Sequence, residues 1–373
     1  MPEADLAPEL KLMRSAAKFA GDMALEMKET GRARHWHKEP GSPITDADLA
    51  VNEYIAKTLQ TARPDYGWLS EETADFHTGR CMKRVWVVDP IDGTRAFIRR
   101  NDPHWCVGIA LVEEGHAVAS VLYAPELDMM FEAMFGSGAF LNGEPLSVST
   151  ETKLPGCKMI TNKGMLTHPA WPEPWPDVQV ADPKPNATLL RFAFVAAGME
   201  DCTIAMVRKS DWDVAAGALL VTEAGGQATT HMGEEFLFNR PDPAQRSIVA
   251  SATRQLHEAV LQKTAKVELP NPADSGDRAL TSNSTEARPM SDAPKTEEQL
   301  LHIVIGGELK DVTGVEFEDL SSLDFVGAYP NYSEAYNAWK SAAQRTVDNA
   351  EMRYFILHAH KLLDPETGSH HHV

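Results

Sequence analysis

RVWVVDPIDGT, at residues 84–94, is an apolar run typical of a buried β-strand, and it ends in two carboxylates. Pro90 stiffens the turn, and Gly93 permits a backbone conformation that other residues avoid. Asp89 and Asp92 lie three apart across this turn, so we expect both to point into one pocket. Two unneutralised carboxylates there would repel and raise one pKa sharply, whereas a divalent cation removes the repulsion. A plain Asx-rich turn is the alternative when this stretch is taken alone.

Three further segments add carboxylates: TDAD at 45–48, EE at 71–72 and WD at 212–213. Glu71 follows a short strand-like run, so it reaches the same pocket if the two strands are neighbours. Asp213 begins a predicted helix, where the helix dipole favours a carboxylate. Taken singly, these acids also suit a solvated turn or a helix N-cap, but together they favour one site. Because the candidate donors are oxygens, the site should select Mg²⁺, or Mn²⁺, over Zn²⁺.

The chain up to residue 265 shows helix and strand periodicity. In the first half, apolar spacing predicts helices over 10–27 and 46–60 and strands over 66–70, 84–91, 105–112 and 117–123. In the second half, it predicts strands over 158–161 and 203–207 that alternate with helices over 188–197 and 211–224. The first half is therefore of the α+β kind and the second an α/β layer. We expect one main domain over 1–265, with subdomains of about 1–150 and 151–265.

The C-terminal part differs in composition. Residues 266–299 are rich in Pro, Ser, Thr and acidic residues and have few large apolar groups, so we expect a disordered linker. Apolar patterning returns over 300–367 and predicts a small ββαβ-like α+β module, with strand-like runs over 301–305, 325–329 and 353–360 and a helix near 333–343. The tail GSHHHV, at 368–373, is interpreted as a frayed end or a tag remnant rather than as a metal site.

Charge and composition restrict the partners. A net charge of −19 over 373 residues repels nucleic-acid polymers and anionic membranes. The first residues do not form a secretory signal, and no apolar run approaches the roughly 18 residues that span a bilayer. The four cysteines, at 81, 106, 157 and 202, form no CxxC pair, so we expect reduced thiols in a cytoplasmic protein.

Four motifs in a fixed order carry a family resemblance: GSPITDAD (41–48), SEET (70–73), WVVDPIDGT (86–94) and SDWDVAAGALLVTEAGG (210–226). Through them, residues 5–255 resemble the inositol monophosphatase-like family of lithium-sensitive phosphatases. The resemblance implies a magnesium-dependent phosphoric monoester hydrolase. It also implies an α/β fold that is a layered α-β-α-β-α sandwich of two subdomains, two or three Mg²⁺ ions, and inhibition by Li⁺.

The resemblance further implies a role for each site residue. The metal ligands would be Glu71, Asp89, the carbonyl of Ile91, Asp92 and Asp213. Thr94, hydrogen-bonded to Asp48, would orient the attacking water, and Glu71 would hold the metal that activates it, in a two-metal in-line displacement. The substrate contacts would be Gly93, Thr94, Arg191, Lys209 and Asp213.

Substrate choice depends on two departures from the family pattern. Met206 stands where inositol-specific members carry Glu, and Asn186-Ala187 replaces a Gly-Ser pair. With Arg191 and the run 209–213, the chain resembles the bacterial 3'(2'),5'-bisphosphate nucleotidase branch, so we expect hydrolysis of adenosine 3',5'-bisphosphate to AMP. An inositol-1-phosphate or other sugar or polyol monophosphatase is the alternative. A non-catalytic sensor or scaffold, working through the C-terminal module, is the alternative of a different class. Arg191 suits an exposed helix position as well as a second-phosphate contact.

The C-terminal module resembles a small bacterial domain of unknown function, from His302 to about Pro365. Its aromatic residues suit either a protein-docking face or, more simply, a compact small core. These residues are Tyr329, Tyr332, Tyr336 and Trp339. The expected partner of the main domain is a small phosphorylated substrate, and a homodimer is left open.

Overall fold

A computed structural model describes residues 6–38, 42–73, 80–169, 171–267, 269, 302–308, 317–319, 322–329, 335, 338–339 and 352–358. The chain divides into two compact units, Met1–Thr285 and Glu286–Val373. The predicted linker lies outside the described residues from 270 onward, and so does the tail.

The helices of the first unit are α1 (Ala7–Glu29), α2 (Asp46–Ala62), α3 (Thr94–Ile98), α4 (Lys163–Leu166), α5 (Thr188–Ala196), α6 (Ala215–Glu223) and α7 (Arg254–Thr264), with 3-10 turns η2 (Pro125–Leu127) and η3 (Asp211–Asp213). Its strands are β1 (His35–Lys38), β2 (Ser42–Thr45), β3 (Gly67–Ser70), β4 (Arg84–Asp92), β5 (Cys106–Glu113), β6 (His116–Ala124), β7 (Met129–Met134), β8 (Gly138–Leu141), β9 (Glu144–Pro145), β10 (Lys158–Ile160), β11 (Gln179–Val180), β12 (Cys202–Ala205), β13 (Lys209–Ser210), β14 (Gln227–Thr229), β15 (Ala244–Gln245) and β16 (Ile248–Ser251).

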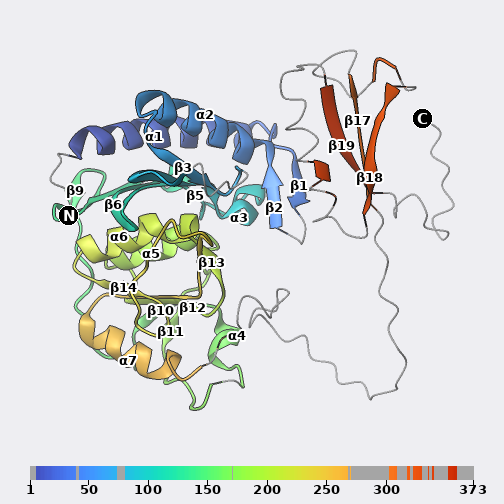
Figure 1. The fold of residues 1–373 in the computed structure, drawn as a ribbon. Coiled ribbons are helices and arrows are strands. Elements are labelled where there is room, and N and C mark those ends of the chain that lie inside the picture. Colours follow the sequence, from blue (N-terminus) through green and yellow to red (C-terminus); the bar gives the residue numbers. More distant parts are fainter. Residues whose placement is uncertain are drawn as a thin grey trace, which may run out of the picture. The chain divides into compact units, whose positions relative to one another are not determined.

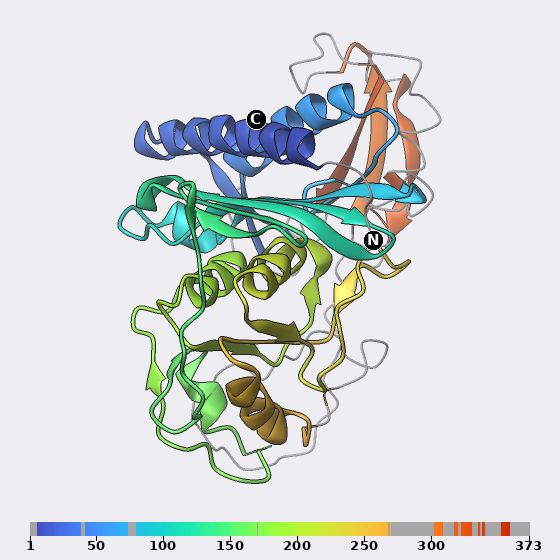
Figure 2. The same ribbon diagram turned by 90° about the vertical axis from the view of Figure 1, so that its left-hand side faces the viewer.

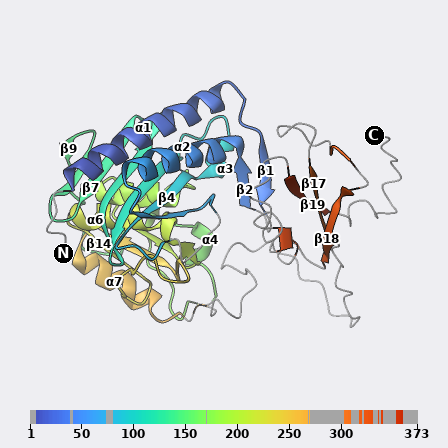
Figure 3. The ribbon, with the colours of Figure 1, turned by 45° about the horizontal axis from the view of Figure 1, so that its top comes forward.

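These elements stack in five layers, as Figures 1 and 2 show from two sides. Helices α1 and α2 lie side by side over the outer face of a seven-stranded sheet (Figure 3). Helices α5 and α6 form the middle layer, a five-stranded sheet follows, and α7 covers its far face. The expected α-β-α-β-α sandwich is confirmed.

The seven-stranded sheet runs in the order β3-β4-β5-β6-β7-β8-β9. Its strands pair antiparallel except β3 and β4, which are parallel with Ser70 opposite Val88. The carboxyl ends of β3 and β4 therefore meet at one edge, so Glu71, just after β3, lies beside the end of β4. The five-stranded sheet is mixed, in the order β11-β10-β12-β16-β14.

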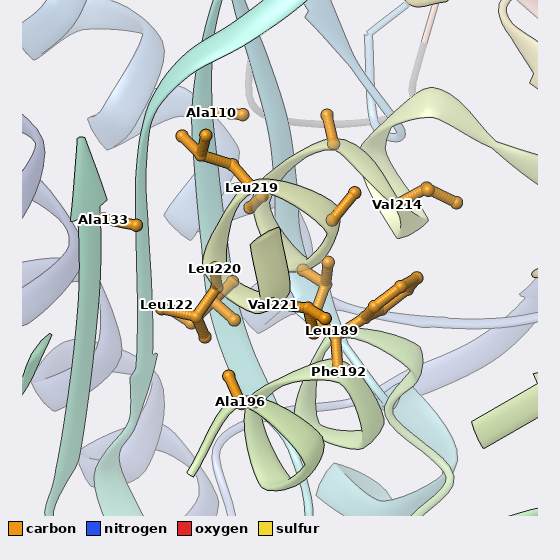
Figure 4. Close-up of a cluster of buried hydrophobic side chains, with 14 of the residues drawn as sticks. Ala110, Leu122, Ala133, Leu189, Phe192, Ala196, Val214, Leu219, Leu220 and Val221 are labelled. Atoms are coloured by element: carbon orange, nitrogen blue, oxygen red, sulfur yellow. The ribbon is translucent and has the colours of Figure 1, made fainter. Parts of the chain in front are cut away.

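Apolar side chains of the middle helices fill the space beneath the seven-stranded sheet (Figure 4). Leu189 and Phe192 of α5 lie beside Leu219 and Leu220 of α6 in this cluster. Gly108 of β5 lets α5 come close, because a Cβ there would lie 2.2 Å from a methyl carbon of Leu189. The close approach brings the start of α5 to the end of β4.

The predicted helix over 211–224 is interrupted. Residues 211–213 form the 3-10 turn η3, Val214 leaves helical geometry at φ −126°, and α6 begins at Ala215. The reason is local: Ser210 and Asp213 form a reciprocal capping box, in which the Asp213 carboxylate accepts the Ser210 amide at 2.9 Å. Asp213 thus ends a 3-10 turn instead of opening the α-helix.

The second unit contains one antiparallel sheet, ordered β18-β17-β19, among the residues that are described. Its strands are β17 (His302–Glu308), β18 (Asp324–Tyr329) and β19 (Met352–His358), close to the predicted runs. Of the helix predicted near 333–343, only Ala335, Ala338 and Trp339 are described. The indole of Trp339 donates to the carbonyl of Tyr354 at 2.7 Å. Tyr332 and Tyr336 lie outside the described residues.

Candidate active site

A cavity of about 680 Å³ collects residues from both halves of the first unit. Glu71, Asp89 and Asp92 line it from the seven-stranded sheet, and Met206 and Asp213 line it from the second half. The sequence-predicted site residues Ile91, Gly93, Thr94, Arg191 and Lys209 line the same cavity. Asp48 lies behind Thr94, outside the lining.

A one-residue bulge in β4 points Asp89 and Asp92 to the same side. In a regular strand, residues three apart face opposite sides of the sheet. Here Asp89 pairs with Gly108 and Asp92 pairs with Cys106, so three steps along β4 match two steps along β5. The extra residue falls in Pro90-Ile91, where proline has no N–H to give to the neighbouring strand. Both carboxylates therefore face the middle helices.

Asp89, Asp92 and Asp213 form the centre of the site. One carboxylate oxygen from each lies within 4.8 Å of the other two. Burial, with repulsion from Glu71 and the neighbouring aspartates, raises the pKa of Asp89 well above its usual range. Burial and the nearby Asp213 raise the pKa of Asp92 to about 7. This much repulsion in a buried place is what a divalent cation would relieve.

The hydrogen bonding of Asp89 indicates whether the cluster suits a divalent cation. Its Oδ1 is buried and has no hydrogen-bond partner among the described residues. A buried acceptor without a donor is costly unless something else satisfies it. The clustered donors are all carboxylate oxygens, which Mg²⁺ prefers. The residues present therefore fit a hard divalent cation.

Asp92 has a second function that the sequence interpretation missed. Its carboxylate accepts the amides of Thr188 at 3.0 Å and Leu189 at 2.5 Å, so it caps the start of α5. Asp92 can therefore cap α5 and still be a candidate metal ligand. No local pattern around residue 92 could have indicated this contact, because its partners are far along the chain.

Thr94 and Asp48 lie together beside the acid cluster. The Thr94 hydroxyl is 3.1 Å from Asp48 Oδ1 and 3.1 Å from the carbonyl of Ile91. Asp48 is held by Thr45, whose hydroxyl and amide both donate to its Oδ2, at 2.5 and 2.7 Å. Burial raises the pKa of Asp48 to about 6, although the Thr45 hydrogen bonds lower it in part. Asp48 is therefore poised to exchange a proton near neutral pH.

The backbone at position 93 requires a glycine. Its φ is +90°, and a Cβ would lie 3.0 Å from the carbonyl oxygen of His104 and 3.0 Å from Cβ of Ala187. Both the conformation and the close approach exclude a side chain.

Cations line the side of the cavity formed by the second half. Lys209 Nζ donates to the Thr188 hydroxyl at 2.8 Å and lies 3.4 Å from Asp213 Oδ1. Arg191 is not an exposed helix residue, because its guanidinium donates to the carbonyls of Pro185 at 2.9 Å and Asn186 at 3.0 Å. Sequence interpretation missed Lys184, which also lines the cavity. The only hint was its place in a Pro-Lys-Pro run just before α5.

Clustered carboxylates with cations beside them in one cavity suit a divalent cation together with an anionic ester. The layered fold and this cavity define the class of metal-dependent phosphomonoesterases. The chain belongs to the inositol monophosphatase family, whose model matches residues 5–269. A second model, a domain of unknown function (DUF4170), matches residues 300–359. The expected resemblances to the inositol monophosphatase family and, for the C-terminal module, to a domain of unknown function are thereby confirmed.

Relatives and solved structures agree with this family. An inositol monophosphatase from Dictyostelium discoideum is 41% identical over 202 residues, which are 49% of this chain and 70% of the relative. A histidinol-phosphatase from Chlorobaculum parvum is 31% identical over 242 residues, 63% of this chain and 90% of the relative. The crystal structure of extragenic suppressor protein SuhB from Bartonella henselae covers 69% of this chain and 98% of its own, with 27% identity and a TM-score of 0.59.

Family membership confirms the predicted class of activity. The family consists of magnesium-dependent phosphatases. The chain is thus a magnesium-dependent phosphoric monoester hydrolase whose substrates are small phosphorylated molecules.

Proposed function

We propose that the enzyme hydrolyses adenosine 3',5'-bisphosphate to AMP and phosphate. The observation that carries this proposal is the lining opposite the acid cluster. Met206, 2% exposed, offers no acceptor for the hydroxyls of a polyol, whereas Arg191 and Lys209 bring positive charge to the same cavity. A substrate with a second phosphate would use that charge.

We assign the metal ions to Glu71, Asp89, the carbonyl of Ile91, Asp92 and Asp213. Two or three Mg²⁺ ions are proposed, with Mn²⁺ as the substitute that the same oxygen donors accept. When bound, the ions supply positive charge for the phosphate and leaving-group oxygens and make water a better nucleophile. The Oδ1 of Asp89, which has no hydrogen-bond partner in the described part of the chain, supports a ligand at the centre of the site.

The residues of the chain then orient the reactants. Thr94 would hold the attacking water, because its hydroxyl is itself oriented by Asp48. Water adds to phosphorus as the ester P–O bond breaks, and the leaving oxygen takes a proton from solvent to become a hydroxyl group. Asp48, with its raised pKa, would accept the proton that the attacking water loses. The amides of Gly93 and Thr94 would donate to the phosphate oxygens, and Glu71 would stay ionised as a ligand.

The alternatives differ in what they require. Inositol 1-phosphate or another sugar or polyol phosphate would need a hydrogen-bond acceptor for its hydroxyls, which Met206 does not supply. Relatives that are named inositol-1-monophosphatase or histidinol-phosphatase keep those substrates open. A non-catalytic sensor or scaffold would tolerate the loss of an acid, but every expected acid is present. Homodimer formation and protein docking by the C-terminal module remain proposals.

A comparison of substrates tests the assignment. We expect kcat/KM for adenosine 3',5'-bisphosphate to exceed that for inositol 1-phosphate by about tenfold or more, since one charge-assisted contact contributes about 1.5–3 kcal/mol. Histidinol phosphate and fructose 1,6-bisphosphate complete the panel. Equal or inverted preference would overturn the nucleotidase assignment and leave the phosphatase class intact.

A cytoplasmic location is part of the same proposal. It is supported by the four cysteines, which all lie among the described residues and form no disulfide there. Within the ranges that the structure describes, no helix has both the length and the apolar character needed to cross a bilayer.

A further inference from the structure

Lys184 is the half-buried cation of the cavity whose charge no described residue neutralises, whereas Arg95, which also lines the cavity, is exposed. Lys209 already contacts Asp213 and Thr188, and Arg191 already donates to two backbone carbonyls. Lys184 lines the same cavity, is half-buried, and has neither a hydrogen bond nor an ion pair with any residue that the structure describes.

The surroundings of Lys184 are unfavourable to its charge. Burial, together with the nearby positive charges of Arg191 and Lys209, lowers the pKa of Lys184 to about 8. A carboxylate beside it would remove this cost, yet the acids of the cavity lie in the cluster around Asp89, and Asp213 is paired with Lys209. A half-buried ammonium held near two other cations needs an anion, which here would come from the ligand.

The segment that carries Lys184 is held in place. Pro183 and Pro185 flank it and restrict the backbone on both sides. The guanidinium of Arg191 donates to the carbonyls of Pro185 and Asn186, so it fixes the loop to the start of α5. Two of the Arg191 donors are thereby occupied. Arg191 acts as a positioning residue, and Lys184 is the group left to meet an anion.

We propose that Lys184 binds a second phosphate of the substrate, at a subsite that Lys209 borders and Arg191 holds in shape. The substrate class is a small molecule that carries a scissile phosphomonoester and another phosphate. This inference rests on the proposed use of the cavity for phosphomonoester hydrolysis, and it replaces Arg191 with Lys184 as the main contact to the second phosphate.

Matched substrates test the subsite. Adenosine 3',5'-bisphosphate and adenosine 3'-monophosphate share the scissile ester and differ only in the second phosphate. We expect Lys184→Met to lower kcat/KM for the bisphosphate by about 10- to 100-fold and that for the monophosphate by less than about threefold. Lys184→Arg keeps the positive charge and should therefore keep part of the kcat/KM preference for the bisphosphate over the monophosphate. Lys163→Met is the matched control, since Lys163 is exposed and paired with Asp182 at 2.9 Å, and it should change neither value.

The outcomes separate this inference from the nucleotide assignment. Fructose 1,6-bisphosphate and fructose 1-phosphate form a second pair. If inositol 1-phosphate beats the nucleotide, yet Lys184→Met removes a bisphosphate preference in the fructose pair, the subsite stands and the nucleotide assignment fails. The subsite is refuted if Lys184→Met lowers kcat/KM equally for both members of a pair. It is also refuted if the wild-type enzyme prefers neither bisphosphate over its matched monophosphate. Thermal unfolding of Lys184→Met and Lys184→Gln shows that each variant is folded before it is assayed.

Discussion

Asp89 lies at the centre of the proposed metal site. Its carboxylate is buried, lies within reach of Asp92 and Asp213, and has one oxygen without a hydrogen-bond partner among the residues that the structure describes. We expect Asp89→Asn to lower kcat by about 100-fold or more, since even the loss of a group behind a metal ligand costs 10- to 100-fold. Phosphate release at saturating Mg²⁺ measures this effect. In EDTA the variant should melt at a higher temperature than the wild type, because a repelled buried carboxylate is removed. Near-normal Mg²⁺-dependent turnover would refute the two-metal assignment.

Thr94 allows a separation of catalysis from metal binding. Its hydroxyl touches Asp48 and the Ile91 carbonyl, whereas the acid cluster does not depend on it. Thr94→Ala should lower kcat by about 10²- to 10⁴-fold, the usual range for a proton-handling group, and leave the Mg²⁺ affinity measured by calorimetry nearly unchanged. Thr94→Ser keeps the hydroxyl and serves as the control. A variant that loses Mg²⁺ binding but keeps its kcat would contradict this role.

At the residue scale, sequence patterns located the acids but not the lysine. Asp89, Asp92 and Asp213 stand in motifs whose residue types and spacing already indicate a cation. Lys184 enters the cavity only because its loop folds back onto Arg191, and that is a contact between segments rather than a pattern within one. Arg191 itself, which suited an exposed helix position equally well, has a guanidinium occupied by backbone carbonyls.

At the element scale, strand β4 and helix α2 place carboxylates with raised pKa values in the folded protein. The Asp92 pKa of about 7 and the Asp48 pKa of about 6 exceed the value of about 4 in an unfolded chain. Between about pH 4 and 7 the metal-free native state therefore binds more protons than the unfolded state, so the free energy of unfolding falls as pH rises.

We expect the metal-free enzyme to be less stable at pH 8 than at pH 5.5, by about 1–4 kcal/mol. Urea unfolding in EDTA at the two pH values measures this difference. Added Mg²⁺ should stabilise the enzyme more at pH 8, where the carboxylates are ionised, and Asp92→Asn should reduce the slope. Stability that rises with pH in EDTA would show that the acids are not repelled in the native state.

Sequence periodicity predicted the strand but not its irregularity. The apolar run up to Val88 indicates β4, and the helices over 7–29 and 46–62 follow from apolar spacing in the same way. The bulge at Pro90-Ile91 depends on pairing with β5, which periodicity does not reveal. The break at Val214 was missed for a related reason, since the Ser210–Asp213 capping box competes with helical hydrogen bonds.

At the scale of the whole molecule, the layered arrangement was expected from the family resemblance rather than from periodicity. We propose that the main domain extends to Leu269, beyond the residue 265 expected from the sequence. Val267 is 5% exposed and packs in a cluster with Leu256 and Val260, and Leu269 lies against the same cluster. A phosphatase domain cut from the chain should therefore end after Leu269.

We expect the truncated chain 1–269 to fold and to keep both kcat/KM and the preference for adenosine 3',5'-bisphosphate. The reason is that every residue assigned to the cavity lies before residue 214. The matched control is chain 1–265, which should be less stable by about 1–3 kcal/mol because it lacks the buried Val267 side chain. If 1–269 is folded but loses the substrate preference, the determinant lies in the C-terminal module.

Because of the bulge in β4, the active site depends on how many residues this strand contains as well as on which residues they are. Pro90→Ala keeps the count, so Asp92 stays on the side of the middle helices. Deleting either Pro90 or Ile91 would change the chain by a single apolar residue and still turn Asp92 toward the α1 and α2 side, because one register step reverses a strand's faces. An alignment that scores mismatches more heavily than gaps would rank these two changes in the wrong order. At this point of the chain, an insertion or a deletion is the more informative event in evolution.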